Sequence, residues 1–476
     1  MKVWFAASEA VPLVKTGGLA DVAGALPKAL GKLGVDVTVV LPKYGAIPEA
    51  FTKDAATLDT FEVQLGWRRQ YCGVLETHAD GVRYLLIDNE SYFKRHYLYG
   101  YGDQEAERFA FFCLAVCEAL VRSKTPPDIV HCHDWQTGLI PMLLRTRYAY
   151  DPGLKPVRTV FTVHNLQYQG VFSRELLKDL LSIGDDLFGE EGLEFYGAGS
   201  CMKAGLRYAD KLTTVSPAYA QEIQTEAYGE KLDGVLRQRA GDLTGILNGI
   251  DTDSYDPQRD PNLAVPYRHS LAKKRKNKSA LQREFGLPES ERTPMIGIVS
   301  RLAGQKGFDL IGEALPELLA EDLQMVVLGS GDPHFEAMLR DASGRHPDKL
   351  FVWFGFNEGL ARRIYAASDM FLMPSRFEPC GLSQLIAMRY LTVPIVRETG
   401  GLRDTVEPYN EFEGTGNGFS FGPAASRDMV FTVRRALAFY KDEAVWERIV
   451  KAGASRDYSW KTSADAYRRI YRELAQ

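Results

Sequence analysis

The stretch from Asp369 to Val406 constrains the fold of this 476-residue chain more than any other. It reads as an apolar strand at 370–373, a polar loop at 375–381, a helix at 382–390, an apolar strand at 393–396 and a Gly-Gly loop that opens another helix. Two helix N-termini therefore follow two strands in succession. In a parallel sheet such loops share one edge, where backbone N–H groups and helix dipoles favour a phosphate-bearing ligand. The stretch predicts an α/β fold with an anion site, which glycines at 381, 400 and 401 let a ligand approach closely.

Strands and helices alternate in both halves of the chain. The first half begins with a strand at 2–8, a helical period at 19–33 and a strand at 35–41, and the second half restarts the pattern at 295–300. The chain is longer than one hydrophobic core usually supports. A segment at 244–257 is rich in turn-forming residues. We therefore expect two doubly wound, Rossmann-like domains, at 1–243 and 258–456, joined by a hinge at 244–257.

Charge and cysteine content exclude several classes of protein. The net charge is −5, which is a poor match for a dedicated nucleic-acid binder. The six cysteines form no CxxC pair, so neither a zinc cluster nor a disulfide framework is indicated. No apolar run approaches the roughly 20 residues that span a bilayer. We expect a cytoplasmic protein with reduced thiols, no membrane partner and no nucleic-acid partner.

A short motif occurs in both halves of the chain. Lys15 to Asp21 reads Lys-Thr-Gly-Gly-Leu-Ala-Asp, and Glu398 to Asp404 reads Glu-Thr-Gly-Gly-Leu-Arg-Asp. Each copy leads into a predicted helix, so a shared way of starting a helix is one interpretation. We favour two anion-facing loops, one in each domain, with Lys15 making the first better suited to phosphate. The first loop lacks both GxGxxG and the Walker pattern, so neither a nicotinamide cofactor nor ATP hydrolysis is indicated.

Two cations follow a predicted strand in the second half. Arg301 comes directly after the strand at 295–300, and Lys306 follows in a glycine-bearing loop. Both lie on the edge that the Glu378 and Gly400 loops share. Surface charge is the alternative interpretation, but two cations at that edge would neutralise a leaving diphosphate without a metal.

Histidines end two strands of the first half. Residues 131–133 read His-Cys-His, but successive strand residues point to opposite faces, so no metal site is predicted there. Asp134 follows this strand. His164 and Asn165 end the strand at 158–163, at the edge where sites are built in α/β folds.

Two further segments allow more than one interpretation. The loop at 92–101 is rich in aromatic residues, including Tyr97 and Tyr99, and either packs under a long loop or offers a sugar-stacking surface. The basic run at 273–278 could be a nucleic-acid or localisation signal. We interpret it as the solvated start of a helix, because the chain as a whole is acidic.

Taken together, the ordered motifs closely resemble bacterial glycogen synthases and the related plant starch synthases, over essentially the whole chain. The motifs are the Lys15 to Asp21 loop, His164-Asn165, Asn248-Gly249-Ile250-Asp251, Ser300-Arg301-Leu302 with Lys306-Gly307, Glu378-Pro379-Cys380-Gly381-Leu382, Thr399-Gly400-Gly401-Leu402 and Tyr458-Ser459-Trp460. The resemblance implies a GT-B fold, in which two Rossmann-like domains face a deep inter-domain cleft. It also implies that the helix at 457–476 crosses back to the N-terminal domain.

The implied activity is the transfer of glucose from ADP-α-glucose to the non-reducing-end 4-hydroxyl of an α-1,4-glucan such as glycogen, with retained configuration. ADP-glucose is then a substrate, and no cofactor and no metal are expected. By the same resemblance, Lys15, Gly17 and Gly18 would contact the donor phosphates, and Arg301 and Lys306 would hold the diphosphate. His164 would lie beside the glucosyl ring, with Glu378 and Cys380 bordering the sugar. The remaining expected substrate-binding residues are Asp21, Asp134, Asn165, Asn248, Gly381, Leu382, Thr399, Gly400 and Gly401, with Tyr97 and Tyr99 for the acceptor.

One departure bears on the mechanism. Relatives in a neighbouring glycosyltransferase family carry two glutamates eight positions apart in this loop, but the position eight after Glu378 is Ile386. Without a carboxylate pair for double displacement, we expect a front-face route in which the departing phosphate deprotonates the acceptor hydroxyl. Glu378 then has a positioning and electrostatic role and is not a nucleophile. The alternatives are a two-lobed carbohydrate-binding protein, a transferase that uses UDP-glucose, a pyridoxal-phosphate glucan phosphorylase and a sugar-nucleotide epimerase.

Overall fold

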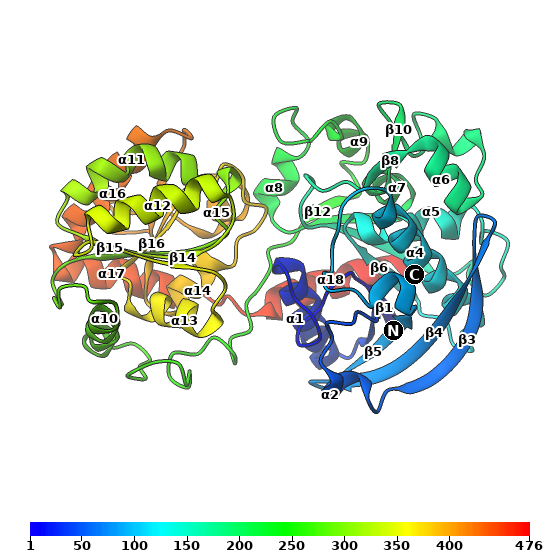
Figure 1. Cartoon of the computed structure of the whole chain (residues 1–476), viewed down its shortest axis with the longest axis horizontal. Coiled ribbons are helices and arrows are strands. Elements are labelled where there is room, and N and C mark those ends of the chain that lie inside the picture. Colours follow the sequence, from blue (N-terminus) through cyan, green and yellow to red (C-terminus); the bar gives the residue numbers. More distant parts are fainter. The chain divides into compact units, whose positions relative to one another are not determined.

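The computed structural model describes residues 1–476, which form two compact units (Figure 1). The first unit comprises Met1–Asn248 together with Trp460–Gln476, and the second comprises Gly249–Ser459. The chain therefore passes from the first unit to the second after Asn248 and returns to the first after Ser459. No helix of the chain combines the length and the apolar character needed to cross a bilayer.

The first unit is built on a nine-stranded sheet in the order β12-β11-β7-β6-β1-β2-β5-β4-β3. Its strands are β1 (Lys2–Ala6), β2 (Asp36–Pro42), β3 (Ala56–Leu65), β4 (Arg68–Ala79), β5 (Val82–Asp88), β6 (Ile129–His133), β7 (Arg158–Val163), β11 (Lys211–Thr214) and β12 (Leu243–Gly245). The strands from β12 to β5 are parallel, and β4 and β3 extend the sheet as antiparallel strands. A small separate sheet joins β8 (Val171–Ser173), β10 (Ala198–Ser200) and β9 (Glu194–Phe195).

Helices connect and cover these strands. They are α1 (Gly18–Lys32), α2 (Glu49–Thr52), α3 (Glu90–Phe93), α4 (Asp103–Arg122), α5 (Leu139–Arg145), α6 (Arg174–Leu181), α7 (Cys201–Tyr208), α8 (Pro217–Glu222), α9 (Asp233–Gln238) and α18 (Trp460–Leu474), with 3₁₀ turns η1 (Trp135–Thr137) and η2 (Asp185–Phe188). The last helix, α18, packs beside α1 within the first unit (Figure 1). Its buried stripe of Trp460, Tyr467 and Tyr471 recurs at helical spacing, which explains why α18 lies on the protein body.

The second unit has a six-stranded parallel sheet in the order β15-β14-β13-β16-β17-β18. The strands are β13 (Met295–Val299), β14 (Gln324–Gly329), β15 (Leu350–Phe354), β16 (Met370–Met373), β17 (Val393–Arg397) and β18 (Phe419–Phe421). The helices are α10 (Leu271–Phe285), α11 (Phe308–Ala320), α12 (Pro333–Arg345), α13 (Glu358–Ala367), α14 (Ser383–Arg389), α15 (Gly400–Thr405), α16 (Ser426–Tyr440) and α17 (Glu443–Ala454), with the 3₁₀ turn η3 (Gly304–Lys306). Helices cover both faces of the sheet (Figure 1), which is why its central strands are almost entirely apolar.

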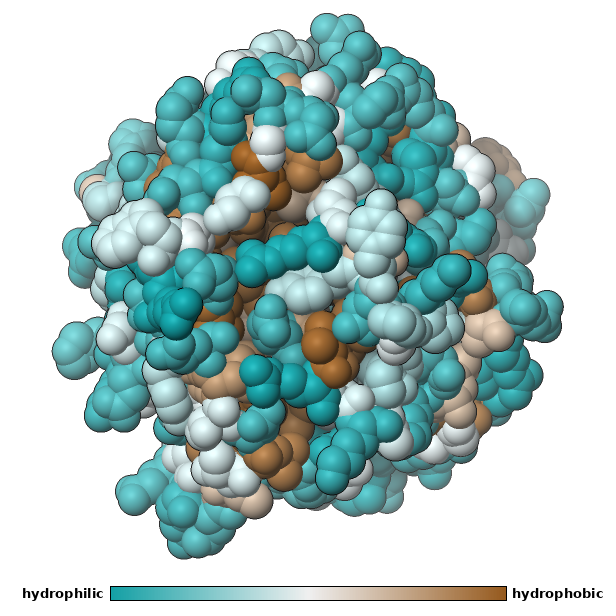
Figure 2. Space-filling model, turned by 90° about the vertical axis from the view of Figure 1, so that its right-hand side faces the viewer, coloured by the Kyte–Doolittle hydropathy of each residue, from teal (hydrophilic) through white to brown (hydrophobic).

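Apolar side chains are mostly buried in these cores. The face of the molecule drawn in Figure 2 is largely hydrophilic, and its apolar residues show as small areas separated by polar ones. The exposed large aromatic residues of the chain include Trp67, Tyr101 and Phe412. Single exposed apolar residues of this kind are ordinary for a globular protein.

The basic run at 273–278 corrects one sequence prediction. Lys273 and Lys276 are exposed as expected, but Lys274 and Lys278 on α10 are only 3% and 1% exposed. Lys274 Nζ donates to four oxygens at 2.7 to 3.0 Å, which are Tyr365 O, Ala366 O, Tyr390 O and Thr392 Oγ1. This ammonium group therefore caps the carboxyl ends of α13 and α14, where cations are stabilised by the last carbonyl groups.

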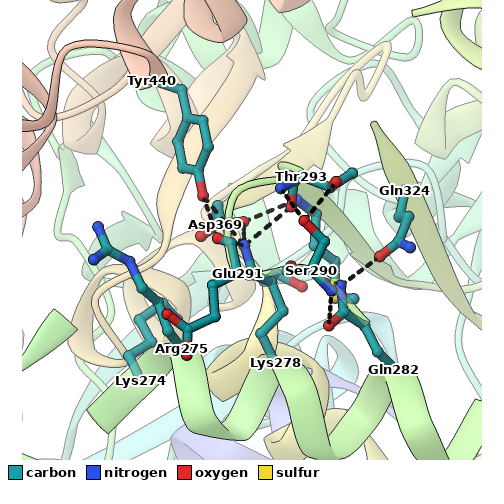
Figure 3. Close-up of polar contacts among 12 residues, drawn as sticks. Lys274, Arg275, Lys278, Gln282, Ser290, Glu291, Thr293, Gln324, Asp369 and Tyr440 are labelled. Carbon is teal, nitrogen blue, oxygen red and sulfur yellow. Dashed lines mark hydrogen bonds and ion pairs between the residues drawn. The ribbon is translucent and has the colours of Figure 1, made fainter. Parts of the chain in front are cut away.

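Lys278 binds a charged partner one turn further along α10 (Figure 3). Its Nζ lies 2.8 Å from Asp369 Oδ2 and also donates to the carbonyl oxygens of Glu291 and Thr293. Asp369 Oδ2 in turn accepts the backbone N–H of Met295 at 2.9 Å. The two buried lysines thus hold α10 against the amino ends of β13, β16 and β17. The sequence pattern missed them because a basic run does not reveal which of its members faces inward.

We expect Lys274→Met to lower the free energy of unfolding of the second unit by about 3 kcal/mol, because three buried carbonyl groups lose a charged donor. Lys276→Met on the exposed face of the same helix is the matched control, with a change within about 0.5 kcal/mol. Calorimetric or denaturant unfolding of both variants checks this. Equal stability of the two variants would show that the buried ammonium group is not a structural cap.

Candidate functional site

The loops that follow β13, β16 and β17 meet at one edge of the second sheet. These three strands are adjacent and parallel, so their carboxyl ends lie side by side. The chain runs from β13 outward to β14 on one side, and later returns to β16 on the other. This reversal of strand order marks the place where open α/β sheets bind ligands. Arg301, Lys306, Glu378 and Gly400 all lie in these loops.

Lys306 and Glu378 form an ion pair at this edge. Lys306 Nζ lies 2.9 Å from Glu378 Oε1 and 2.6 Å from Oε2. Ser375 Oγ donates to the same Oε2 at 2.9 Å. Glu378 is buried and Lys306 is partly exposed, with side-chain exposures of 8% and 19%. The carboxylate is therefore fully engaged within the protein, while the Lys306 side chain stays partly accessible.

Close backbone contacts hold the two loops together. The N–H of Arg376 donates to the carbonyl oxygen of Gln305 at 2.8 Å, which ties the loop after β16 to η3. Gly307 has φ of +77°, and a Cβ at this position would lie 2.2 Å from the carbonyl oxygen of Pro374. Only glycine combines this backbone conformation with such a close approach. Gly307 therefore allows η3 to approach the loop after β16 closely enough for Lys306 to pair with Glu378.

Arg301 differs from Lys306 in its surroundings. It is exposed, and its guanidinium donates only a long hydrogen bond of 3.4 Å to Gln305 Oε1. It follows β13 directly, on the edge that carries Lys306 and Glu378. Arg301 thus adds an exposed cation to the edge that carries the Lys306–Glu378 pair.

The glycines at 400 and 401 pack tightly against the loop after β16. A Cβ on Gly400 would lie 2.0 Å from the carbonyl oxygen of Glu378, and a Cβ on Gly401 would lie 2.1 Å from that of Cys380. The N–H of Gly401 donates to the carbonyl oxygens of Glu378 and Pro379, both at 3.1 Å. These glycines admit the neighbouring loop, and the amide of Gly401 is hydrogen-bonded within the protein.

The other predicted residues of the second unit lie in the same two loops. Cys380 is buried, Gly381 has φ of +72°, and Leu382 is the N-cap residue of α14. Thr399 is buried, and its carbonyl oxygen accepts the N–H of Leu402. Gln384, which we did not predict, donates to Cys380 O, Gly381 O and Thr405 Oγ1 at 3.0 to 3.1 Å. It therefore joins α14 to α15.

In the first unit, the Lys15 loop leads from β1 into α1. Lys15 Nζ pairs with Asp21 Oδ1 at 2.8 Å, so two predicted residues meet. Glu9, which we did not predict, accepts hydrogen bonds from the N–H and Oγ1 of Thr16. Burial raises the pKa of Glu9, although hydrogen bonds from Thr16 and Gly17 oppose the rise. Gly18 faces open space, with no atom within 4 Å of a Cβ placed there.

The carboxyl ends of β6 and β7 carry a second group of predicted residues in the first unit. Asp134 has φ of +57°, and its Oδ1 accepts the backbone N–H groups of His164 at 2.7 Å and Asn165 at 3.4 Å. Burial raises the pKa of Asp134 to about 7, although these two donors oppose the rise. Burial lowers the pKa of His164 to about 3, so its imidazole is neutral at neutral pH. Since β6 and β7 neighbour each other in the sheet, the structure brings these three residues together.

The predicted residues Tyr97, Tyr99 and Asn248 differ in their exposure and in their hydrogen bonding. Tyr97 is 47% exposed, whereas the hydroxyl of Tyr99 hydrogen-bonds Ser8 Oγ at 2.7 Å. The two tyrosines therefore do not form one exposed stacking surface. Asn248 is buried at the last position of the first unit before the chain leaves it, and its Oδ1 has no hydrogen-bond partner.

No group of three or more His, Cys, Asp and Glu residues in the chain is arranged to hold a metal ion. Within the His-Cys-His run, His131 bonds Tyr471 Oη and Thr162 Oγ1, and His133 Nδ1 lies 2.9 Å from His164 Nε2. The run thus contains a partner of a predicted site residue. The sequence showed that His133 ends a strand and shares a face with His131. Its contact with His164 could not be predicted, because it depends on the pairing of β6 with β7.

Two family descriptions match the chain. Residues 2–238 match the starch synthase catalytic domain, and residues 282–453 match the glycosyl transferases group 1. Glycogen synthases of Anoxybacillus flavithermus and Desulforamulus reducens are each 53% identical over 475 residues, covering 100% of this chain and 98% and 99% of theirs. That of Bacillus cereus is 52% identical over 478 residues and is fully covered.

Two solved structures are similar to the whole chain. The catalytic domain of starch synthase IV from Arabidopsis thaliana, bound to ADP and acarbose, has a TM-score of 0.92 and 36% identity, covering 100% of this chain and 99% of that one. Sucrose-phosphate synthase from Thermosynechococcus elongatus has a TM-score of 0.64 and 19% identity, covering 99% and 98%. The latter supports the fold alone, and together the matches confirm the predicted GT-B class.

The two copies of the Thr-Gly-Gly-Leu motif give a matched test of packing. We expect Gly401→Ala to lower the melting temperature of the second unit by several degrees, because its Cβ meets the backbone of Cys380. Gly18→Ala, the corresponding change in the first copy, should leave the melting temperature within a degree or two, since its Cβ meets nothing. Calorimetry of the two variants measures both effects. A larger loss in Gly18→Ala than in Gly401→Ala would contradict the packing account.

Proposed function

Because the chain belongs to the glycogen and starch synthase family of glucosyltransferases, we propose that it transfers glucose from ADP-α-glucose to the non-reducing-end 4-hydroxyl of an α-1,4-glucan, with retained configuration. The family assignment carries the reaction class. The ADP in the Arabidopsis starch synthase structure supports the choice of donor. We further propose that the reaction takes place in the cytoplasm and needs neither a metal nor a cofactor.

The observation that carries the assignment of roles is the Lys306–Glu378 ion pair, with Arg301 on the same sheet edge. When the bond between the anomeric carbon and the phosphate oxygen breaks, negative charge develops on the diphosphate. Fixed cations at that point stabilise the transition state more than the ground state. We assign Lys306 and Arg301 to the leaving diphosphate. Lys306 is held in place by Glu378, and Arg301 is exposed on the same edge.

Glu378 acts as a positioning residue in this proposal. A carboxylate nucleophile needs an oxygen directed at the anomeric carbon, but both oxygens of Glu378 accept hydrogen bonds from Lys306 and one also accepts from Ser375. Ile386 occupies the place of a second glutamate. These features support a front-face displacement, in which the departing phosphate oxygen takes the proton of the acceptor hydroxyl as the new glycosidic bond forms.

The first unit supplies the remaining proposed contacts. Lys15 with Gly17 and Gly18 would approach the donor phosphates, because Gly18 is open and Lys15 is exposed. His164 and Asn165 would lie beside the glucosyl ring, with Asp134 fixing their backbone N–H groups. The other assigned contacts to donor and sugar are Asp21, Asn248, Cys380, Gly381, Leu382, Thr399, Gly400 and Gly401. For the acceptor glucan, exposed Tyr97 is a better candidate than Tyr99, whose hydroxyl is bonded to Ser8.

Release of ADP tests the proposed reaction. The full-length protein is incubated with ADP-glucose or UDP-glucose, with and without glycogen, in buffer containing EDTA. We expect ADP to appear only when ADP-glucose and glycogen are both present, and EDTA to leave the rate unchanged. Turnover with UDP-glucose alone would overturn the donor assignment. No nucleotide release under any condition would favour a carbohydrate-binding role instead.

Alanine substitutions test the two assigned cations. We expect Lys306→Ala and Arg301→Ala each to lower kcat by about a hundredfold, as for loss of one group that stabilises developing charge. Lys276→Ala, an exposed lysine of α10, is the control and should leave kcat unchanged. Steady-state ADP release measures all three. Near-normal turnover in either Lys306→Ala or Arg301→Ala would remove that residue from the proposed role.

A further inference from the structure

Three imidazole rings lie together at the carboxyl ends of β6 and β7. His131 and His133 share one face of β6, with ring centroids 4.1 Å apart, and His133 and His164 have centroids 5.1 Å apart. Both ring nitrogens of His131 are occupied, by Tyr471 Oη at 2.7 Å and Thr162 Oγ1 at 2.6 Å. The tautomers of His133 and His164 depend instead on the hydrogen bond between these two rings.

His133 is held rigidly and hydrogen-bonds the ring of His164. Its Nδ1 lies 2.9 Å from His164 Nε2, and its ring packs on Phe5 with centroids 4.0 Å apart. Its backbone N–H donates to Thr137 Oγ1 at 2.6 Å. His133 is fully buried, and its second nitrogen, Nε2, has no hydrogen-bond partner. This unpartnered nitrogen decides which of the two rings donates the hydrogen bond between His133 and His164.

Burial lowers the pKa of both His133 and His164, so each ring carries one proton at neutral pH. A hydrogen bond between two neutral rings needs the proton on one side only. If His164 Nε2–H were the donor, the proton of His133 would have to sit on Nε2, as a buried N–H group with no acceptor. If His133 Nδ1–H is the donor, Nε2 of His133 is left as a buried lone pair.

A buried N–H group without an acceptor is the rarer and more costly of these two states. We infer that His133 donates its Nδ1 proton to His164 Nε2 and thereby fixes His164 in the Nδ1–H tautomer. His133 is then a positioning residue for His164. This assignment of protons needs no ligand and does not depend on the proposed reaction.

The catalytic consequence rests on the proposed function. In this tautomer the Nδ1 of His164 already carries a proton and its Nε2 lone pair is occupied by His133, so His164 has no site at which to accept a proton. It presents a fixed N–H donor, suited to a hydroxyl oxygen of the glucosyl ring. The ring of His164 has no hydrogen bond within the chain other than that to His133, which leaves its Nδ1–H available. His164 therefore does not take the acceptor proton, which agrees with the proposed transfer of that proton to the departing phosphate.

Nitrogen NMR of the full-length protein with ¹⁵N-labelled histidine tests the assignment directly. A protonated ring nitrogen resonates far upfield of an unprotonated one, and a scalar coupling across the hydrogen bond identifies the two nitrogens that share the proton. We expect protonated Nδ1 on both His133 and His164, with coupling between His133 Nδ1 and His164 Nε2. Signals are assigned by their loss in His164→Gln and His133→Asn. A protonated Nε2 on His164 would overturn the inference.

Two variants of His133 with similar volume test its positioning role. His133→Leu removes the donor, and His133→Asn keeps an amide N–H near the position of Nδ1. We expect kcat to fall about tenfold in His133→Leu and to be largely restored in His133→Asn, as for one hydrogen bond. Circular dichroism and melting temperature confirm that both variants are folded. Equal loss of kcat in the two variants would contradict the role of the donor. If the protein transfers no glucose at all, the proposed function fails while the NMR result still decides the tautomer.

Discussion

The ion pair between Lys306 and Glu378 is the interaction on which the site of the second unit depends. It joins the loop after β13 to the loop after β16, two strands that neighbour each other in the sheet. Because Glu378 is buried, removal of Lys306 would leave a carboxylate with a large desolvation penalty. The pair therefore holds Lys306 in place before any ligand arrives, and such preorganisation makes a cation effective at a developing negative charge.

Backbone packing makes this pair possible. The loop after β16 contacts its neighbours so closely that Gly307 on one side and Gly400 and Gly401 on the other leave no space for a Cβ. At the opposite edge of the sheet, where the strands begin, Lys274 binds the carboxyl ends of α13 and α14. The Lys278–Asp369 pair fixes the start of β16 at the same edge. The first unit uses the same principle at β6 and β7, where Asp134 binds the backbone of His164 and His133 binds its ring.

Much of this arrangement follows from the sequence, and some of it does not. Alternating strands and helices and the ordered motifs were enough to predict the fold class and to place Arg301, Lys306 and Glu378 at one sheet edge. The contacts of Lys274, His133 and Gln384 were missed, because each depends on which face of a helix or strand packs inward. The packing of Gly401 against Cys380 was missed for a related reason, because a Gly-Gly pair predicts a close approach but does not identify the segment that approaches.

A double-mutant cycle on kcat/KM for ADP-glucose tests most directly whether Lys306 and Glu378 act as one unit. The cycle compares Lys306→Met, Glu378→Gln and the double variant with the wild type. If Glu378 works by holding Lys306, the double variant loses little more activity than the more damaged single variant. If the two losses multiply, the residues act independently, and the account of Glu378 as the positioning partner of Lys306 is contradicted.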